Sequence, residues 1–131
     1  MKKINFKKGV GELLEAAITL PIILFMLGFL INLFQIAQCE QRLIYSTYFC
    51  GRAACVAYDQ NEAKTAIDNT LAEIVSDESL QADIQVNGAW MKGNFVVVTV
   101  SQNLNPVFGV GKGLHSRRIA IMIEHSKWIT E

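Results

Sequence analysis

Residues 16–37, AAITLPIILFMLGFLINLFQIA, form an uncharged run of 22 residues that decides the architecture of the chain. A helix of that length measures about 33 Å, enough to cross the hydrocarbon core of a bilayer. A cleaved secretory signal has a shorter apolar region, about 7–15 residues, and ends in a small-x-small site. A lipoprotein signal ending at Cys39 would have a small residue in place of Gln38. We therefore expect a retained membrane-spanning helix.

Charge is distributed unevenly along a chain whose formal net charge is zero. The N-terminus has a basic cluster with no acid, made up of Lys2, Lys3, Lys7 and Lys8. Residues 40–131 carry eight Lys and Arg against ten Asp and Glu. The positive-inside rule predicts that the N-terminus stays in the cytoplasm while the body crosses the membrane. The slightly acidic body lacks the basic face that nucleic-acid binding requires.

Helical periodicity continues beyond the apolar run. Residues 38–58, QCEQRLIYSTYFCGRAACVAY, contain no proline and keep a helical stripe. The stripe consists of Ile44, Tyr48, Gly51, Cys55 and Tyr58. We expect one helix from about Gly11 to Tyr58 that leaves the membrane near Cys39. Asp59 is the expected N-cap of a second helix, with Glu62 as its capping-box partner. The predicted apolar face of the second helix is Ala63, Ala66, Ile67, Thr70, Leu71, Ile74 and Val75.

After Ser79 the hydrophobic period changes to two, which is typical of strands. Alternation through Ile84 predicts a half-exposed strand, and residues 95–101, FVVVTVS, are apolar on both faces and suit a central strand. A last strand carries Ile119, Ile121 and Ile123, and residues 103–115, NLNPVFGVGKGLH, are expected to be a loop.

The predicted fold class is α+β. It has a basic cytoplasmic leader (residues 1–11), a long helix (12–58) with its span at about 16–37, and an extracytoplasmic head (59–131). The head should contain the second amphipathic helix and about three antiparallel strands. Such a small head buries only a modest core, so we expect the distal half of the long helix to form one wall of it.

Three cysteines lie on the long helix. Cys39 and Cys50 are eleven residues apart, about 16 Å along the axis, which exceeds the limit of about 7 Å for a disulfide. Cys50 and Cys55 diverge around the helix. The thiols are therefore either small packing residues, or they bond to a partner chain or across a bend at Gly51.

Catalytic and ligand-binding patterns are missing from the sequence. GVGKG, residues 109–113, has no Ser or Thr after its lysine and precedes a strand, unlike a phosphate-binding loop. His115 and His125 would be about 33 Å apart on an extended chain, too far to share a metal ion. Aromatic residues are assigned to packing or interfaces: Tyr45, Tyr48, Phe49 and Trp90. We expect a non-enzymatic protein with no cofactor, metal, nucleic acid or small-molecule substrate.

Glu15 stands at the threshold of the uncharged run, where an unpaired carboxylate is expensive. It either pairs with Lys7 or Lys8 at the headgroup level, or pairs with a positive group on a neighbouring helix and sets the register between them. Pro21 removes a backbone donor within the span, and neighbouring helices can satisfy the freed carbonyl.

Residues 7–25, KKGVGELLEAAITLPIILF, resemble the N-terminus of TadE-like minor pseudopilins of the tight-adherence (Flp, type IVb) pilus system. That family has basic residues, a glycine and a pattern like VEAALVLPLFL. LEAAITLPIIL matches it with Glu15, Ala16, Ala17 and Pro21 in place. Residues 44–58 look like the family's NAAREGARYAA stretch. Residues 95–125 resemble its closing strand, proline-containing loop and last strand.

The resemblance implies a leader that a prepilin peptidase removes after a glycine, on the cytoplasmic side, leaving a glutamate as the fifth residue. Glu15 is the sixth residue after Gly9 and the fourth after Gly11. Gly9 is the preferred site, while Gly11 and an uncleaved chain stay open. In a cleaved chain the new α-amine would pair with a neighbour's Glu15; in an uncleaved chain Lys7 or Lys8 would do so.

The resemblance also implies a function and a location. A minor pseudopilin sits in the bacterial inner membrane with other pilins and assembly-platform proteins, and primes, caps or sparsely populates a pilus. The alternative is a single-pass anchored α/β module that binds an extracytoplasmic partner and never enters a filament.

Overall fold

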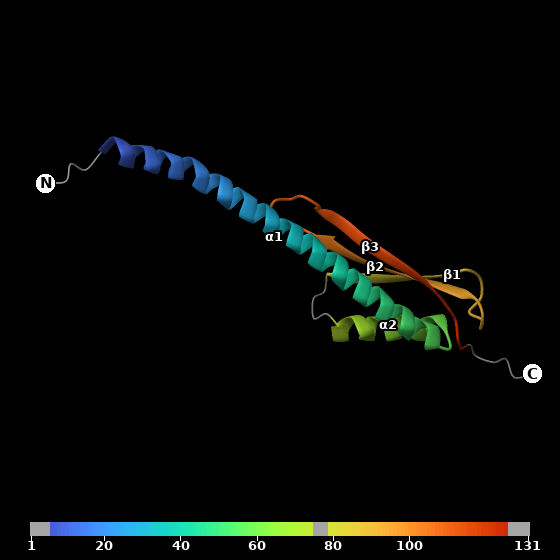
Figure 1. The fold of residues 1–131 in the computed structure, drawn as a ribbon. Coiled ribbons are helices and arrows are strands. Elements are labelled where there is room, and N and C mark those ends of the chain that lie inside the picture. The colour runs from blue at the N-terminus through green and yellow to red at the C-terminus, as the bar shows by residue number, and fades with distance from the viewer. Residues whose placement is uncertain (1–5, 75–78, 126–131) are drawn as a thin grey trace, which may run out of the picture.

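The computed structural model describes residues 6–74 and 79–125. They form α1 (Phe6–Val56), α2 (Gln60–Ile74), β1 (Leu80–Val86), β2 (Phe95–Leu104) and β3 (Gly113–Met122). Figure 1 shows α1 as a long rod whose C-terminal part lies against the sheet while its N-terminal part projects from the head. The predicted α+β class, with a long apolar N-terminal helix, is confirmed. Lys2, Lys3 and Val75 lie outside the described residues.

The three strands form one antiparallel sheet in the order β1-β2-β3. β2 is central, as its apolar faces predicted, and Val98 lies opposite Ile84 on one side and Ile119 on the other. The loop predicted over 103–115 is longer than the observed one at both ends. The β2–β3 ladder runs on to the pairs Gln102–His115, Asn103–Leu114 and Leu104–Gly113, so only residues 105–112 connect the strands.

The core lies between the sheet and the C-terminal half of α1. Leu43, Cys50 and Ala54 of α1 are fully buried with Val96, Val98 and Val100 of β2. The expectation that the long helix forms one wall of the core is confirmed. A Cβ on Gly51 would collide with Ile121 and lie 3.0 Å from the Ile119 side chain, so glycine lets this helix approach the sheet closely.

The stripe predicted on this part of α1 is only partly buried, at Gly51 and Cys55. Ile44 and Tyr48 are 51% and 52% exposed. The buried face runs one residue earlier, through Leu43, Thr47, Cys50 and Ala54. Small side chains at these positions fit against the pleated sheet, whereas the bulky aromatics project from the opposite side. The packed face here combines small residues with Leu43, and the tyrosines lie outside it.

α2 begins where the sequence predicted, with a different cap geometry. The Glu62 carboxylate accepts a hydrogen bond from the Tyr58 amide at 3.0 Å, one residue before the Asp59 amide of a standard capping box. The Asp59 carboxylate accepts from the Gln60 amide at 2.6 Å. Ala63, Ile67 and Leu71 form the buried face. Ile74 is 38% exposed, so the last turn adds less to the core than its apolar pattern predicted.

Candidate functional site

Within residues 6–74 and 79–125, the first part of α1 is left largely uncovered. Every side chain from Gly9 to Leu27 is exposed, and we call these residues the bare segment. Its large apolar members are Val10, Leu13, Leu14, Ile18, Leu20, Ile22, Ile23, Leu24, Phe25, Met26 and Leu27. Within the described residues one helix, Gly9–Val56, is long and apolar enough to cross a membrane. A continuous apolar surface of this size needs lipid or other protein to cover it.

The bare segment carries the residues that the sequence singled out for processing and assembly. α1 already includes Phe6, so it contains Gly9, Gly11 and part of the expected leader. A Cβ added at either glycine would meet no other atom within 4 Å. The helix continues through Pro21. Whether a peptidase cuts at either glycine stays a prediction.

Glu15 lies on the same exposed surface. Among the side chains that the structure describes, none forms an ion pair with its carboxylate; those of Lys7 and Lys8 lie outside the description. The Thr19 hydroxyl donates to the backbone carbonyl of Glu15 at 2.9 Å, so this hydroxyl has its hydrogen-bond partner within the helix. Pairing of Glu15, in this chain or with a neighbour, stays a prediction.

A contact that the sequence analysis missed begins at Asn32, whose side chain is fully buried. Its Nδ2 donates to the Val110 carbonyl at 2.9 Å, and its Oδ1 accepts from the Phe108 amide at 3.1 Å. Gln35 Oε1 accepts from the Val107 amide at 3.2 Å. These bonds fasten the 105–112 loop to α1. The span expected at 16–37 is therefore not bare throughout, because Asn32 and Gln35 contact this loop. Large apolar side chains between and beside them, such as Phe34, remain exposed.

Two glycines let the loop approach the helix. The Phe108 ring meets Phe25 edge-on, with centroids 6.0 Å apart, and it occupies the space that a Cβ on Gly28 would need. Gly111 has φ +80°, which disfavours other residues, and a Cβ there would lie 2.8 Å from Ile36 Cδ1. Within the GVGKG motif, Gly111 thus packs against α1, while Gly109 and Gly113 have positive φ.

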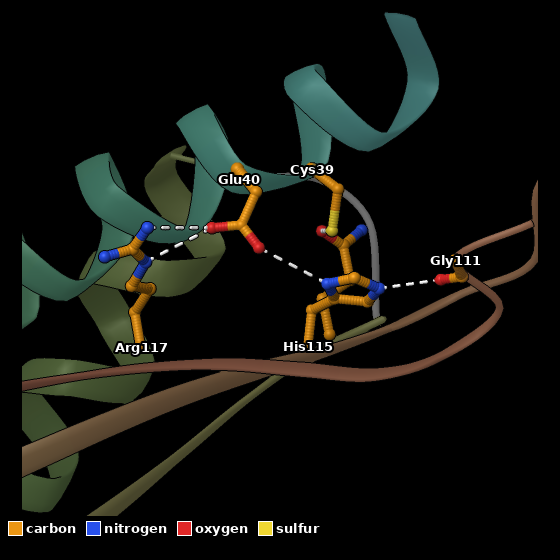
Figure 2. Close-up of polar contacts among 6 residues, drawn as sticks. Cys39, Glu40, Gly111, His115 and Arg117 are labelled. Atoms are coloured by element: carbon orange, nitrogen blue, oxygen red, sulfur yellow. Dashed lines mark hydrogen bonds and ion pairs between the residues drawn. The ribbon is translucent and has the colours of Figure 1, made fainter. Parts of the chain in front are cut away.

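A charged cluster fastens β3 to α1 just beyond the loop (Figure 2). Glu40 Oε2 lies 3.1 Å from Arg117 Nη2, and Glu40 Oε1 lies 3.3 Å from His115 Nδ1. His115 Nε2 donates to the Gly111 carbonyl at 2.7 Å. Hydrogen bonds from His115 and then Arg117 lower the pKa of Glu40. The bonds to Gly111 and then Glu40 raise the pKa of His115, because acceptors at both ring nitrogens favour the imidazolium.

All three cysteines are free and buried, in agreement with the packing alternative. The pKa of each thiol is raised, mainly by burial, and that of Cys50 rises to about 11. Cys39 donates weakly to Gln102 Oε1 at 3.5 Å, and Cys55 to the Arg52 carbonyl at 3.1 Å. Reactive thiols need a lowered pKa and access to solvent, and these three have neither. A disulfide to a partner chain stays a prediction.

The remaining candidates for ligand binding have packing roles or lie apart. Trp90 Nε1 donates to the Ala57 carbonyl at 3.0 Å and so ties the β1–β2 connection to the end of α1. Tyr45 and Tyr48 lie on the exposed face of α1, each with its ring beside Phe49. Among residues 6–74 and 79–125, no three His, Cys, Asp or Glu side chains gather as metal ligands. Comparisons of the chain with protein-family models, curated proteins and solved structures find no match.

Proposed function

We propose that this chain is a minor pseudopilin. It is a non-enzymatic, bitopic protein of the bacterial inner membrane, with its N-terminus in the cytoplasm. The bare segment packs side by side with the helices of related subunits, and the protein primes, caps or sparsely populates a tight-adherence pilus. The observation that carries the proposal is the bare segment itself, since its apolar surface from Gly9 to Leu27 is exposed in the described part of the chain.

The continuity of α1 supports the proposal. One helix of 51 residues runs from the bare segment into the core of the head, with Leu43, Cys50 and Ala54 buried against or near the sheet. There is no linker between the membrane part and the head. Lateral packing of the bare segment therefore fixes the position of the head, as a filament subunit requires.

Glu15 gives the packing a preferred register. A carboxylate among exposed apolar side chains is costly in hydrocarbon, and a positive group on a neighbouring helix removes that cost. After cleavage by a prepilin peptidase at Gly9, or at Gly11, the neighbour's α-amine supplies the charge; without cleavage Lys7 or Lys8 supplies it. Glu12 lies one turn before Glu15 and is a matched control of the same charge.

The test is affinity capture from native membranes in mild detergent, with the N-terminus of the captured chain sequenced directly. Glu15→Ala should insert normally and recover several-fold fewer pilin partners than the wild type, whereas Glu12→Ala should recover them almost fully. Equal recovery by both variants and the wild type would contradict the pairing and favour the alternative, an anchored module with an extracytoplasmic partner.

A further inference from the structure

We infer that the 105–112 loop enters the bilayer beside α1, on the side of the membrane that faces the head, with phospholipid acyl chains covering its tip. The inference rests on the membrane span of the proposed function and adds a second membrane-contacting element. The tip exposes three apolar side chains, with Val107 70%, Phe108 46% and Val110 50% exposed. Together with the bare segment they form one continuous apolar surface, because Phe108 packs on Phe25 and Gly28.

The depth of the loop follows from its contacts with α1. If Glu15 marks one edge of a hydrocarbon core about 30 Å thick, then Gly28 lies about 20 Å along the helix and Asn32 about 26 Å. Phe108 touches Gly28, so its ring lies about 10 Å below the opposite edge. With Glu15 at that edge, the residues from Glu15 to Leu27 are too few to span the bilayer alone. A spanning α1 therefore brings the loop into the membrane with it.

Several polar groups of the loop backbone already have partners within the protein. Irregular backbone at membrane depth must have its polar groups satisfied by protein. Asn32 binds the Phe108 amide and the Val110 carbonyl, and Gln35 binds the Val107 amide. The amides of Gly109 and Lys112 donate to the carbonyls of Pro106 and Gly109 within the loop. Pro106 itself has no amide hydrogen to satisfy.

Polarity along the loop changes in the direction that a membrane surface requires. Lys112 is exposed beside the apolar tip, and its long side chain can reach the headgroup phosphates while its stem stays in the apolar layer. The charged cluster of Glu40, His115 and Arg117 comes next, further from the bare segment. This order of apolar tip, lysine and ion cluster favours lipid over the helix of a second copy as the occupant.

The loop can be tested with an environment-sensitive fluorophore (NBD) on single introduced cysteines, in the full-length protein reconstituted in phosphatidylglycerol/phosphatidylethanolamine vesicles. Val107→Cys reports on the loop, Leu20→Cys on the bare segment, and Met91→Cys, 56% exposed in the β1–β2 connection, on the distal end of the head. The native thiols are at most 3% exposed, and the labelled wild type gives the background.

At Val107 we expect blue-shifted emission, quenching by spin-labelled lipid and several-fold protection from aqueous iodide, all independent of the protein-to-lipid ratio. Emission like that at Met91 would overturn the inference. So would a blue shift at Val107 that disappears as the protein is diluted in lipid, since protein would then be the cover. If Leu20 is in lipid and Val107 in water, only the loop inference fails; if both are in water, the membrane span of the proposed function fails as well.

Discussion

The two halves of α1 belong to one helix and differ in what surrounds them. From Gly9 to Leu27 bulky apolar side chains face outward on every side. From Gly28 to Val56 small residues such as Cys50, Gly51 and Ala54 face the head, and Tyr45 and Tyr48 face away from it. Apolar character alone therefore does not identify the buried face of this helix. The sheet packs against Leu43 and small residues at helical spacing, whereas the bare segment matches a medium that packs around all of its sides.

The largest test of this contrast compares one leucine in each half. Leu43→Ala removes a fully buried side chain between α1 and the sheet, and should lower the free energy of unfolding of the head by about 3 kcal/mol. Leu20→Ala changes a side chain that is 59% exposed, and should change that free energy by less than about 0.5 kcal/mol. Urea unfolding in detergent, followed by tryptophan fluorescence, measures both. Equal losses would contradict the division of α1 into two halves.

The boundary between the halves is tested at Asn32. Asn32→Leu removes both hydrogen bonds to the 105–112 loop, so the Phe108 amide should exchange with solvent about tenfold faster or more, equivalent to about 1.4 kcal/mol. Thr19→Val is the control, because it replaces a polar side chain of the bare segment whose hydroxyl bonds only within α1. Hydrogen exchange in micelles is the measurement. Unchanged exchange at Phe108 would show that the loop does not depend on Asn32.

A smaller effect of opposite sign is expected at Ser46. Its hydroxyl is buried, and within the described part of the chain it has no hydrogen-bond partner. Ser46→Ala should therefore raise the free energy of unfolding by about 1 kcal/mol. The neighbouring Thr47 hydroxyl donates to the Leu43 carbonyl, so Thr47→Val should not stabilise the head. The same urea titration measures both free energies of unfolding. A lower value for Ser46→Ala than for the wild type would mean that the Ser46 hydroxyl has a hydrogen-bond partner.

The smallest effect concerns pH. The raised pKa of His115 means that its contribution to stability is complete below the unfolded pKa of about 6.5 and is lost as pH rises through the folded value. The lowered pKa of Glu40 gives a contribution present above about 4.3 and lost as pH falls through the folded value. For this partly exposed cluster we expect at most about 1 kcal/mol. His115→Gln should remove the loss of stability as pH rises. If the variant and the wild type have the same dependence of unfolding free energy on pH, the contribution of His115 is contradicted.

The sequence predicted the elements well because their periods are strong. The uncharged run predicted the long helix, the apolar faces of residues 95–101 predicted the central strand, and the small size of the head predicted that α1 would form part of its core. The predicted helical stripe is buried at Gly51 and Cys55 but exposed at Ile44 and Tyr48. Apolar residues stand on both neighbouring stripes, so hydrophobicity alone could not choose between them.

The contact between the loop and α1 could not be predicted from periodicity, since it joins residues more than seventy positions apart. One local signal was present. Asn32 and Gln35 are carboxamides within the uncharged run, and such groups need partners in an apolar medium. The glycines at 109, 111 and 113 predicted a loop but not the helix that it packs on. For Glu15 the structure supplies a position on the bare segment, and its partner stays a prediction.

The central claim is that other subunits cover the bare segment. The most direct measurement is photocrosslinking in native membranes, with a benzophenone amino acid placed at Leu20 in the bare segment and, as the control, at Met91 in the head. If related subunits pack on the bare segment, Leu20 should form defined adducts with one or more pilin-like proteins. Glu15→Ala should reduce these adducts, and Glu12→Ala should leave them unchanged. If Leu20 crosslinks only to lipid in membranes that contain the assembly proteins, the account is contradicted.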